Sequence, residues 1–306
     1  MARRRAVCGA GEAHGHLVAF VDVIGLRRKT DPSPGELASL PHVPQLDGLR
    51  AVAVMAVVVF HNNERLLPGG FIGVDLFFVL SGYLITRLLI VEHRSTGKLS
   101  LSTFYARRLR RLLPASLAVL LAVIGWTAVA GAPSALVPTR GDIVATLAYV
   151  ANWRFVATDV DYFGLAGTVS PLRHFWSLAV EEQFYVLWPV LVAVVLGARR
   201  SRNNQRLLLG VTAALAVASA VWIAAVFDPV APTRAYFGTD TRAHQMLIGA
   251  LAGMVQARGM VSLGRCRAWA QVGALGALGA FMLLLDGSDA AYFRGGSVAV
   301  AMVAAL

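Results

Sequence analysis

Residues 44–91 read PQLDGLRAVAVMAVVVFHNNERLLPGGFIGVDLFFVLSGYLITRLLIV, two apolar stretches joined by a short polar turn. A transmembrane helix needs about 20 predominantly apolar residues, so each stretch is long enough to cross a bilayer. Ionisable residues nevertheless lie in or at the ends of both stretches, namely Asp47, Arg50, His61 and Asp75. Charged side chains at membrane depth are costly and usually face the interior of a helix bundle or a wet cavity. We therefore expect this pair of helices to carry part of a functional site.

The composition of the whole chain agrees with a membrane protein. Hydrophobic residues make up 57% of the 306 residues and charged residues only 15%, with a mean hydropathy of +0.63. Soluble proteins have about 25% charged residues. The sequence therefore predicts an all-α fold, a polytopic transmembrane helical bundle with about nine apolar segments. They lie at 46–62, 71–91, 112–131, 142–157, 175–196, 207–227, 242–257, 269–285 and 296–306.

Two ends of the chain depart from this pattern. Residues 1–43 form a basic arm punctuated by glycine and proline, which we expect in the cytoplasm. The last apolar segment is too short to cross a bilayer, so we expect the membrane domain, 44–306, to be incomplete at its carboxyl end.

Cys8 and Cys266 both fall in segments assigned to the cytoplasm, which disfavours a disulfide. Neither has a metal-ligand spacing, and no metal site is expected.

The net charge of +11 indicates membrane topology rather than a nucleic-acid partner, because the arginines cluster between apolar segments without a nucleic-acid motif. The positive-inside rule places the amino terminus, 92–111, 198–206 and 258–267 in the cytoplasm. It leaves 63–70, 158–174 and 228–241 outside. Segment 142–157 would then begin and end on one side. Either it is re-entrant or interfacial, or one loop is wrongly assigned.

The spacing of the ionisable residues suggests a site for proton transfer. Arg50 and His61 are eleven residues apart, close to three helical turns, so they share one helix face about 16 Å apart. His61 and Asp75 lie at similar depth near the outer ends of neighbouring helices. A carboxylate beside an imidazole fixes its tautomer and favours a general base that takes a proton from a hydroxyl. The simpler alternatives are polar groups that reach the two interfaces, and an Asp75 that caps the free N–H groups of its helix.

Several motifs resemble the membrane acyltransferase-3 family. They are Pro44–Arg50, the Arg50-x10-His61 spacing, Gly70–Leu84, Phe104–Pro114 and Phe175–Tyr185. The resemblance implies an integral protein of the bacterial cytoplasmic membrane with no bound cofactor. It also implies an O-acyltransferase that moves an acyl group, most often acetyl, from cytoplasmic acyl-CoA to a hydroxyl of an envelope glycan or glycolipid. Family members acylate polysaccharides, lipopolysaccharide or peptidoglycan, and some continue into an extracytoplasmic domain.

The segment at 175–196 adds further candidates. Ser177 and Glu181 are four residues apart and share a face, whereas Glu182 is rotated by about 100°. The family pattern W-x-L-x-x-E-x-x-F/Y matches Trp176 and Glu181, so we expect Glu181 to act with His61 and Asp75 in catalysis. Ser177, Trp176 and Asp47 are further candidates. A Ser/His/Asp hydrolase is disfavoured because no Gly-x-Ser-x-Gly turn is present.

Basic residues and outer aromatic residues provide candidate binding groups. Arginines interleave with apolar residues at 104–113, which indicates an interfacial helix that contacts lipid phosphates. Among them Arg107 and Arg108, together with Arg50, are expected to bind the phosphates of the donor. Four aromatic residues of the outer loops are candidates for stacking on sugar rings: Tyr162, Phe163, Tyr236 and Phe237.

The competing function is a transporter or flippase for a polar envelope precursor, with the charged residues at membrane depth forming its path. Such folds usually contain internal repeats and paired broken helices. The sequence shows no convincing repeat, which favours the acyltransferase.

Overall fold

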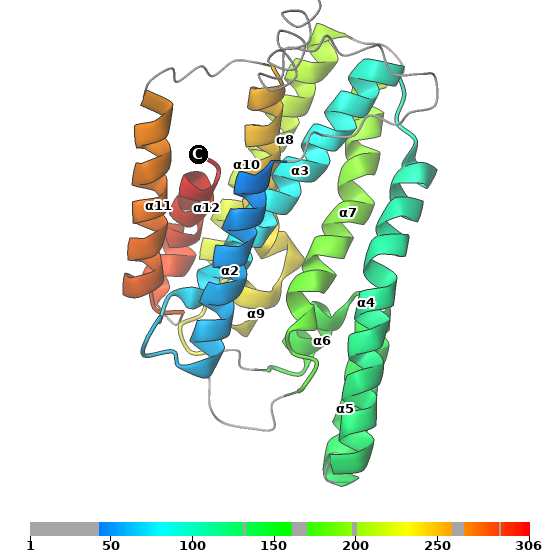
Figure 1. The fold of residues 1–306 in the computed structure, drawn as a ribbon, viewed down its shortest axis with the longest axis vertical. Helices are drawn as coiled ribbons and strands as arrows, with labels where there is room; N and C mark the ends of the chain where they lie inside the picture. Colours follow the sequence, from blue (N-terminus) through cyan, green and yellow to red (C-terminus); the bar gives the residue numbers. More distant parts are fainter. Residues whose placement is uncertain (1–42, 131–132, 161–169, 198–200, 259–265, 288) are drawn as a thin grey trace, which may run out of the picture. The chain divides into compact units, whose positions relative to one another are not determined.

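The computed structural model describes residues 43–130, 133–160, 170–197, 201–258, 266–287 and 289–306. The basic arm and Cys8 lie outside these residues. The compact unit within 38–306 is helical throughout, without a strand in its described parts (Figure 1). Its longer helices are α2 (Pro44–Asn62), α3 (Gly73–Thr96), α4 (Leu101–Ala130), α5 (Pro133–Leu147), α7 (Phe175–Leu196), α8 (Arg202–Val226), α10 (Thr239–Ala257) and α11 (Cys266–Leu284). The shorter elements are η1 (Gly70–Ile72), α6 (Ala151–Ala157), α9 (Thr233–Phe237), η2 (Tyr292–Gly296) and α12 (Ser297–Ala304).

Five helical segments of the described chain are long and apolar enough to cross a membrane. They are Pro44–Asn62, Gly70–Thr96, Leu101–Val129, Phe175–Leu196 and Arg202–Val226. Large apolar side chains on these helices and on α11 face outward, for example Trp126, Val194 and Trp269, which are 73%, 75% and 79% exposed. Exposed side chains of this size suit contact with lipid rather than water. The expected polytopic helical bundle is confirmed.

Two predicted segments have different bounds in the structure. Helix α4 begins at Leu101 rather than at 112, because the arginine-rich stretch continues the apolar helix without a break and Pro114 is accommodated inside it. The predicted segment 142–157 is divided between α5 and α6, with Tyr149 in a left-handed conformation (φ 54°) at the break. With 15 and 7 residues, α5 and α6 are too short to span a bilayer. Both contact α7, as a re-entrant or interfacial hairpin would.

Helices α3 and α10 form the centre of the bundle. They approach closely because glycine faces backbone at their crossing: a Cβ on Gly82 would lie 1.8 Å from the Met246 carbonyl oxygen, and one on Gly249 would lie 1.9 Å from that of Val79. Small residues of this kind allow close helix packing in membranes. Helices α2, α7, α8 and α12 pack around the pair (Figure 1). The residues that face α3 and α10 are therefore the most deeply buried.

Candidate active site

His61 is near the carboxyl end of α2, where its side chain is exposed. Its Nδ1 lies 2.8 Å from the carbonyl oxygen of Val57, one turn earlier. A carbonyl oxygen can only accept, so Nδ1 carries the proton and the neutral ring holds its lone pair on Nε2. The helix backbone thus selects the tautomer in which Nε2 is the basic nitrogen.

A second histidine, His174, lies against this ring. The two ring centroids are 4.7 Å apart in an edge-to-face arrangement, which joins the end of α2 to the residue that precedes α7. Partial burial, together with the nearby His61 and Arg173, lowers the pKa of His174 to about 4. His174 is therefore neutral at physiological pH. Sequence reasoning missed it, although it directly precedes the Phe175–Tyr185 motif.

Asp75 is held by residues that are distant in the sequence. Its side chain is 1% exposed, and its Oδ1 lies 3.3 Å from Nη1 of Arg242 on α10. The hydroxyl of Tyr292 donates to Oδ2 at 2.6 Å and also contacts Nη1 of Arg242. These contacts of Asp75 are thus with Arg242 and Tyr292 rather than with His61. Asp75 faces inward toward α10, while the Nδ1–H of His61 is already bound by the backbone of α2.

Aromatic residues enclose the Arg242 guanidinium. Its central carbon lies 4.3, 5.4 and 5.7 Å from the ring centroids of Tyr236, Tyr292 and Trp176. Its Nε donates to the carbonyl of Tyr236 at 2.8 Å. Cation–π contacts of this kind gain strength where water is excluded. Trp176, which is 1% exposed, thus packs against the ion pair from α7.

Glu181 belongs to a polar cluster between α3 and α7. Its Oε1 accepts hydrogen bonds from the Ser81 and Tyr185 hydroxyls. Ser177 instead donates to the carbonyl of His174 at 3.3 Å, so Ser177 and Glu181 share a face without bonding to each other. The neighbouring Glu182 lies 3.5 Å from Arg108.

The arginines expected to bind the donor occupy different settings. Arg50 lies 3.3 Å from Asp47, and the two side chains are 33% and 52% exposed. The guanidinium of Arg108 stacks on Tyr185, with its central carbon 3.5 Å from the ring centroid, besides pairing with Glu182. Arg107 is half-buried on α4. The structure therefore brings Arg108 to the Glu181 cluster and leaves Arg50 at the start of α2.

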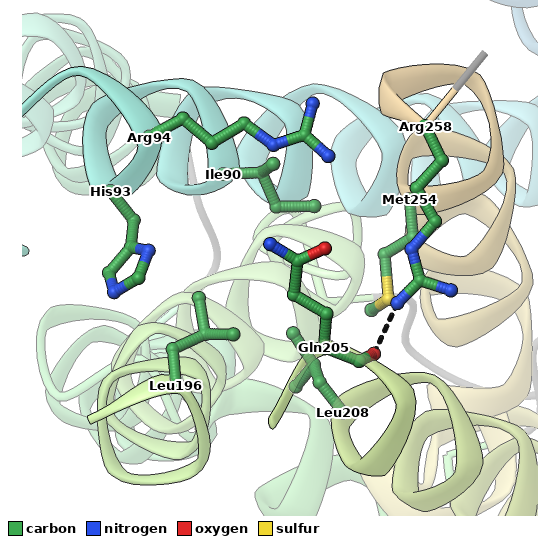
Figure 2. A pocket seen from close by; sticks show the side chains of 8 residues that line it. All are labelled: Ile90, His93, Arg94, Leu196, Gln205, Leu208, Met254 and Arg258. Atoms are coloured by element: carbon green, nitrogen blue, oxygen red, sulfur yellow. Dashed lines mark hydrogen bonds between the residues drawn. The ribbon is translucent and has the colours of Figure 1, made fainter. Parts of the chain in front are cut away.

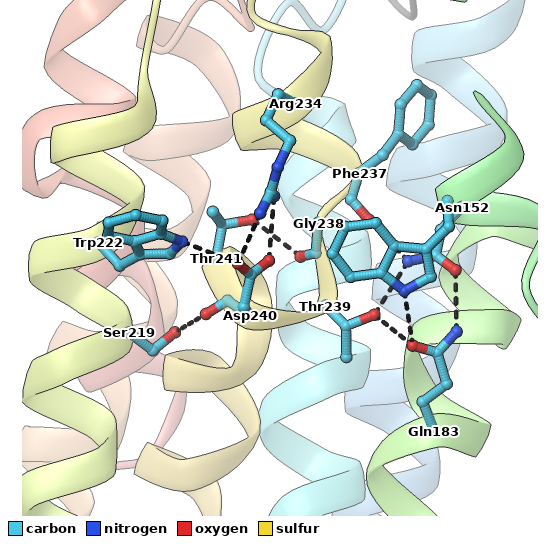
Figure 3. Close-up of polar contacts among 11 residues, drawn as sticks. Asn152, Gln183, Ser219, Trp222, Arg234, Phe237, Gly238, Thr239, Asp240 and Thr241 are labelled. Carbon is cyan, nitrogen blue, oxygen red and sulfur yellow. Dashed lines mark hydrogen bonds and ion pairs between the residues drawn. The ribbon is translucent and has the colours of Figure 1, made fainter. Parts of the chain in front are cut away.

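Another polar network fixes α9 and the start of α10 (Figure 3). The Gln183 amide on α7 accepts from Trp153 and Thr239 at 3.1 and 2.6 Å and donates to Asn152 at 2.9 Å. Asn152 in turn donates to the carbonyl of Phe237 at 3.0 Å.

The aromatic residues of this region do not form the expected sugar surface. Tyr236 and Phe237 are 1% and 0% exposed, so the prediction that they stack on sugar rings is wrong. Tyr162 and Phe163 lie outside the described residues.

Among the described residues, no three His, Cys, Asp or Glu side chains gather as a metal site would require.

A comparison with known protein families identifies the family of this chain. The family profile described as an acyltransferase domain, acyltransferase-3, matches residues 43–306. The chain belongs to the acyltransferase-3 family. Peptidoglycan O-acetyltransferase OatA of Listeria monocytogenes is 45% identical over 69% of this chain and 33% of its own length. The putative peptidoglycan O-acetyltransferase YrhL of Bacillus subtilis is 41% identical over 70% of this chain and 33% of its own. A putative O-acetyltransferase of Staphylococcus aureus is 41% identical over 69% of this chain and 34% of its own.

This acyltransferase-3 chain thus spans about a third of the length of the curated relatives it matches. No solved structure matches it.

Proposed function

We propose that this protein is a membrane O-acetyltransferase that moves an acetyl group from an acyl-CoA donor to a hydroxyl of an envelope glycan. The observation that carries the proposal is the exposed His61, whose Nδ1 is committed to Val57 and whose Nε2 is therefore basic. The names of the Listeria monocytogenes and Bacillus subtilis relatives support peptidoglycan as the acceptor class.

In the proposed reaction, Nε2 of His61 takes the proton of the acceptor hydroxyl as its oxygen attacks the thioester carbonyl. The carbon–sulfur bond of the donor then breaks, and the leaving thiolate takes the same proton from the imidazolium. Proton and electron pairs therefore balance without a further reactant. General base catalysis by a positioned side chain contributes about 10² to 10⁴ in rate.

Asp75 and Glu181 act in this account as positioning residues. The Asp75–Arg242 pair ties the start of α3 to α10, and Glu181 ties α7 to Ser81 of α3. His174, which precedes α7, is thereby held against His61. Precise placement of this kind matters because a misplacement of about 1 Å can cost about 100-fold in rate.

The proposed orientation puts the amino terminus in the cytoplasm and His61 at the outer face. It rests on the arginines that flank α3 and α8, following the positive-inside rule. Labelling of Leu66→Cys and Arg202→Cys, in a chain without Cys8 and Cys266, should report opposite sides of the membrane. Leu66 suits this test because its side chain is 65% exposed.

The transfer itself is tested with the full chain in liposomes, labelled acetyl-CoA and peptidoglycan fragments. We expect the labelled acetyl group to appear in an alkali-labile ester on the glycan, with release of free CoA. A chain that moves a glycan precursor across the membrane without consuming acetyl-CoA would support the transporter instead.

A further inference from the structure

A basic pocket lies at the end of the bundle opposite His61, between α3, α7, α8 and α10. The empty space among its lining side chains is about 310 Å³, and this figure includes open solvent (Figure 2). Arg94 and Arg258 line it together with the apolar side chains of Leu208 and Met254. From Asp75 to Arg94, α3 rises about 28 Å, close to the thickness of a bilayer core. The pocket and the proposed general base therefore lie near opposite membrane faces.

The two arginines are fixed by bonds between helices. Arg94 on α3 donates to the carbonyl of Ala257 at the end of α10, and Arg258 donates to the carbonyl of Gln205 on α8. Each bond uses one of the five N–H groups of a guanidinium and leaves its charge uncancelled. Figure 2 shows both side chains at the same pocket. Two oriented guanidinium groups from different helices are thus prepared for one ligand.

Acidic residues are absent from the parts of α7, α8 and α10 that line this pocket. There is no Asp or Glu between Glu182 and Asp228, or between Asp240 and Asp286. The nearby Glu92 is buried and accepts a hydrogen bond from the backbone N–H of Ser100 at 3.0 Å. Burial lowers the pKa of Arg258, and Arg94 and Arg206 lower it further. The positive charges therefore repel one another, and a bound anion would relieve that repulsion.

We propose that this pocket binds a phosphate group through Arg94 and Arg258. Guanidinium forks match the geometry of phosphate oxygens, and the Leu208 and Met254 side chains suit the carbon skeleton attached to the phosphate. The phosphate belongs either to the CoA of the donor or to an anionic lipid headgroup. The donor source rests on the proposed function, whereas the lipid source does not.

The two sources are separated by two measurements on the full chain. The first is the affinity of CoA for the protein in phosphatidylcholine nanodiscs, compared with dephospho-CoA. The second is native mass spectrometry of the phosphatidylglycerol retained by the protein. Arg94→Gln/Arg258→Gln should weaken CoA binding or phosphatidylglycerol retention by about tenfold or more, because the charged hydrogen bonds to the phosphate are lost. Arg202→Gln, an exposed arginine of α8 outside the pocket, is the matched control and should change neither.

Each result decides the proposal. Loss of CoA binding assigns the pocket to the donor, and loss of phosphatidylglycerol alone assigns it to lipid. A monodisperse double variant that binds both ligands at wild-type levels overturns the phosphate site. The site is also overturned if Arg202→Gln loses as much ligand binding as the double variant does. Acetyl transfer is measured separately: a protein that retains lipid at the pocket but transfers no acetyl group contradicts only the proposed function.

Discussion

The guanidinium of Arg242 lies 3.3 Å from the carboxylate of Asp75, which precedes it by 167 residues, and both side chains are buried. Removing one partner of such a pair leaves an uncompensated buried charge, at a cost of about 3–5 kcal/mol. We therefore expect Asp75→Asn to lower the free energy of unfolding by about that amount in detergent titrations. Asp47→Asn, which breaks the exposed pair with Arg50, should cost only about 0–1 kcal/mol. Equal losses in the two variants would contradict the assignment.

The glycines at the crossing of α3 and α10 give a second prediction. Gly249→Val should prevent close packing, because a Cβ there would lie 1.9 Å from the Val79 carbonyl oxygen. Gly210→Ala on α8 is the control, since a Cβ there meets no atom within 4 Å. The control should be neutral or gain up to about 1 kcal/mol, as alanine favours helices over glycine. Thermal unfolding of Gly249→Val at the wild-type temperature would show that the crossing is looser than described.

Stability should also depend on pH through His174. Burial lowers its pKa from 6.5 to about 4 in the folded protein. Between those values the unfolded chain binds more protons, so stability is full above pH 6.5 and falls as the pH drops toward 4. Glutamine does not titrate, so His174→Gln should remove this loss, and the melting temperature of the wild type should fall relative to that of the variant as the pH drops from 6.5 toward 4. Parallel curves for the two proteins would refute the shift.

Much of the fold could be predicted from the sequence, because apolar segments with charged ends determine transmembrane helices directly. The predicted segment 175–196 coincides with α7, and His61 lies at the expected end of α2. The partner of Asp75 could not be predicted, because a contact with Arg242 depends on how α3 and α10 cross, which local spacing does not encode. The burial of Tyr236 was missed for the same reason, since an aromatic residue near a membrane interface can face either way.

Arg50 offers a test of donor binding that is independent of the basic pocket. Arg50 either only pairs with Asp47 and fixes the start of α2, or its guanidinium anchors the donor. Arg50→Lys retains the charge but loses the planar fork. If Arg50 anchors the donor, acetyl-CoA affinity should fall about tenfold in Arg50→Lys and stay unchanged in Asp47→Asn. An unchanged affinity in both Arg50→Lys and Arg50→Ala would restrict Arg50 to a structural role.

The central claim, that His61 is the general base of acetyl transfer, is tested most directly by the turnover of His61→Gln in the full chain. The account predicts that kcat falls by about 10² to 10⁴ while acetyl-CoA affinity is retained. Asn62→Ala is the matched control, because Asn62 is exposed beside His61 and also bonds a carbonyl of α2, that of Val58. It should turn over like the wild type. Near-normal turnover by a folded His61→Gln protein would contradict the account.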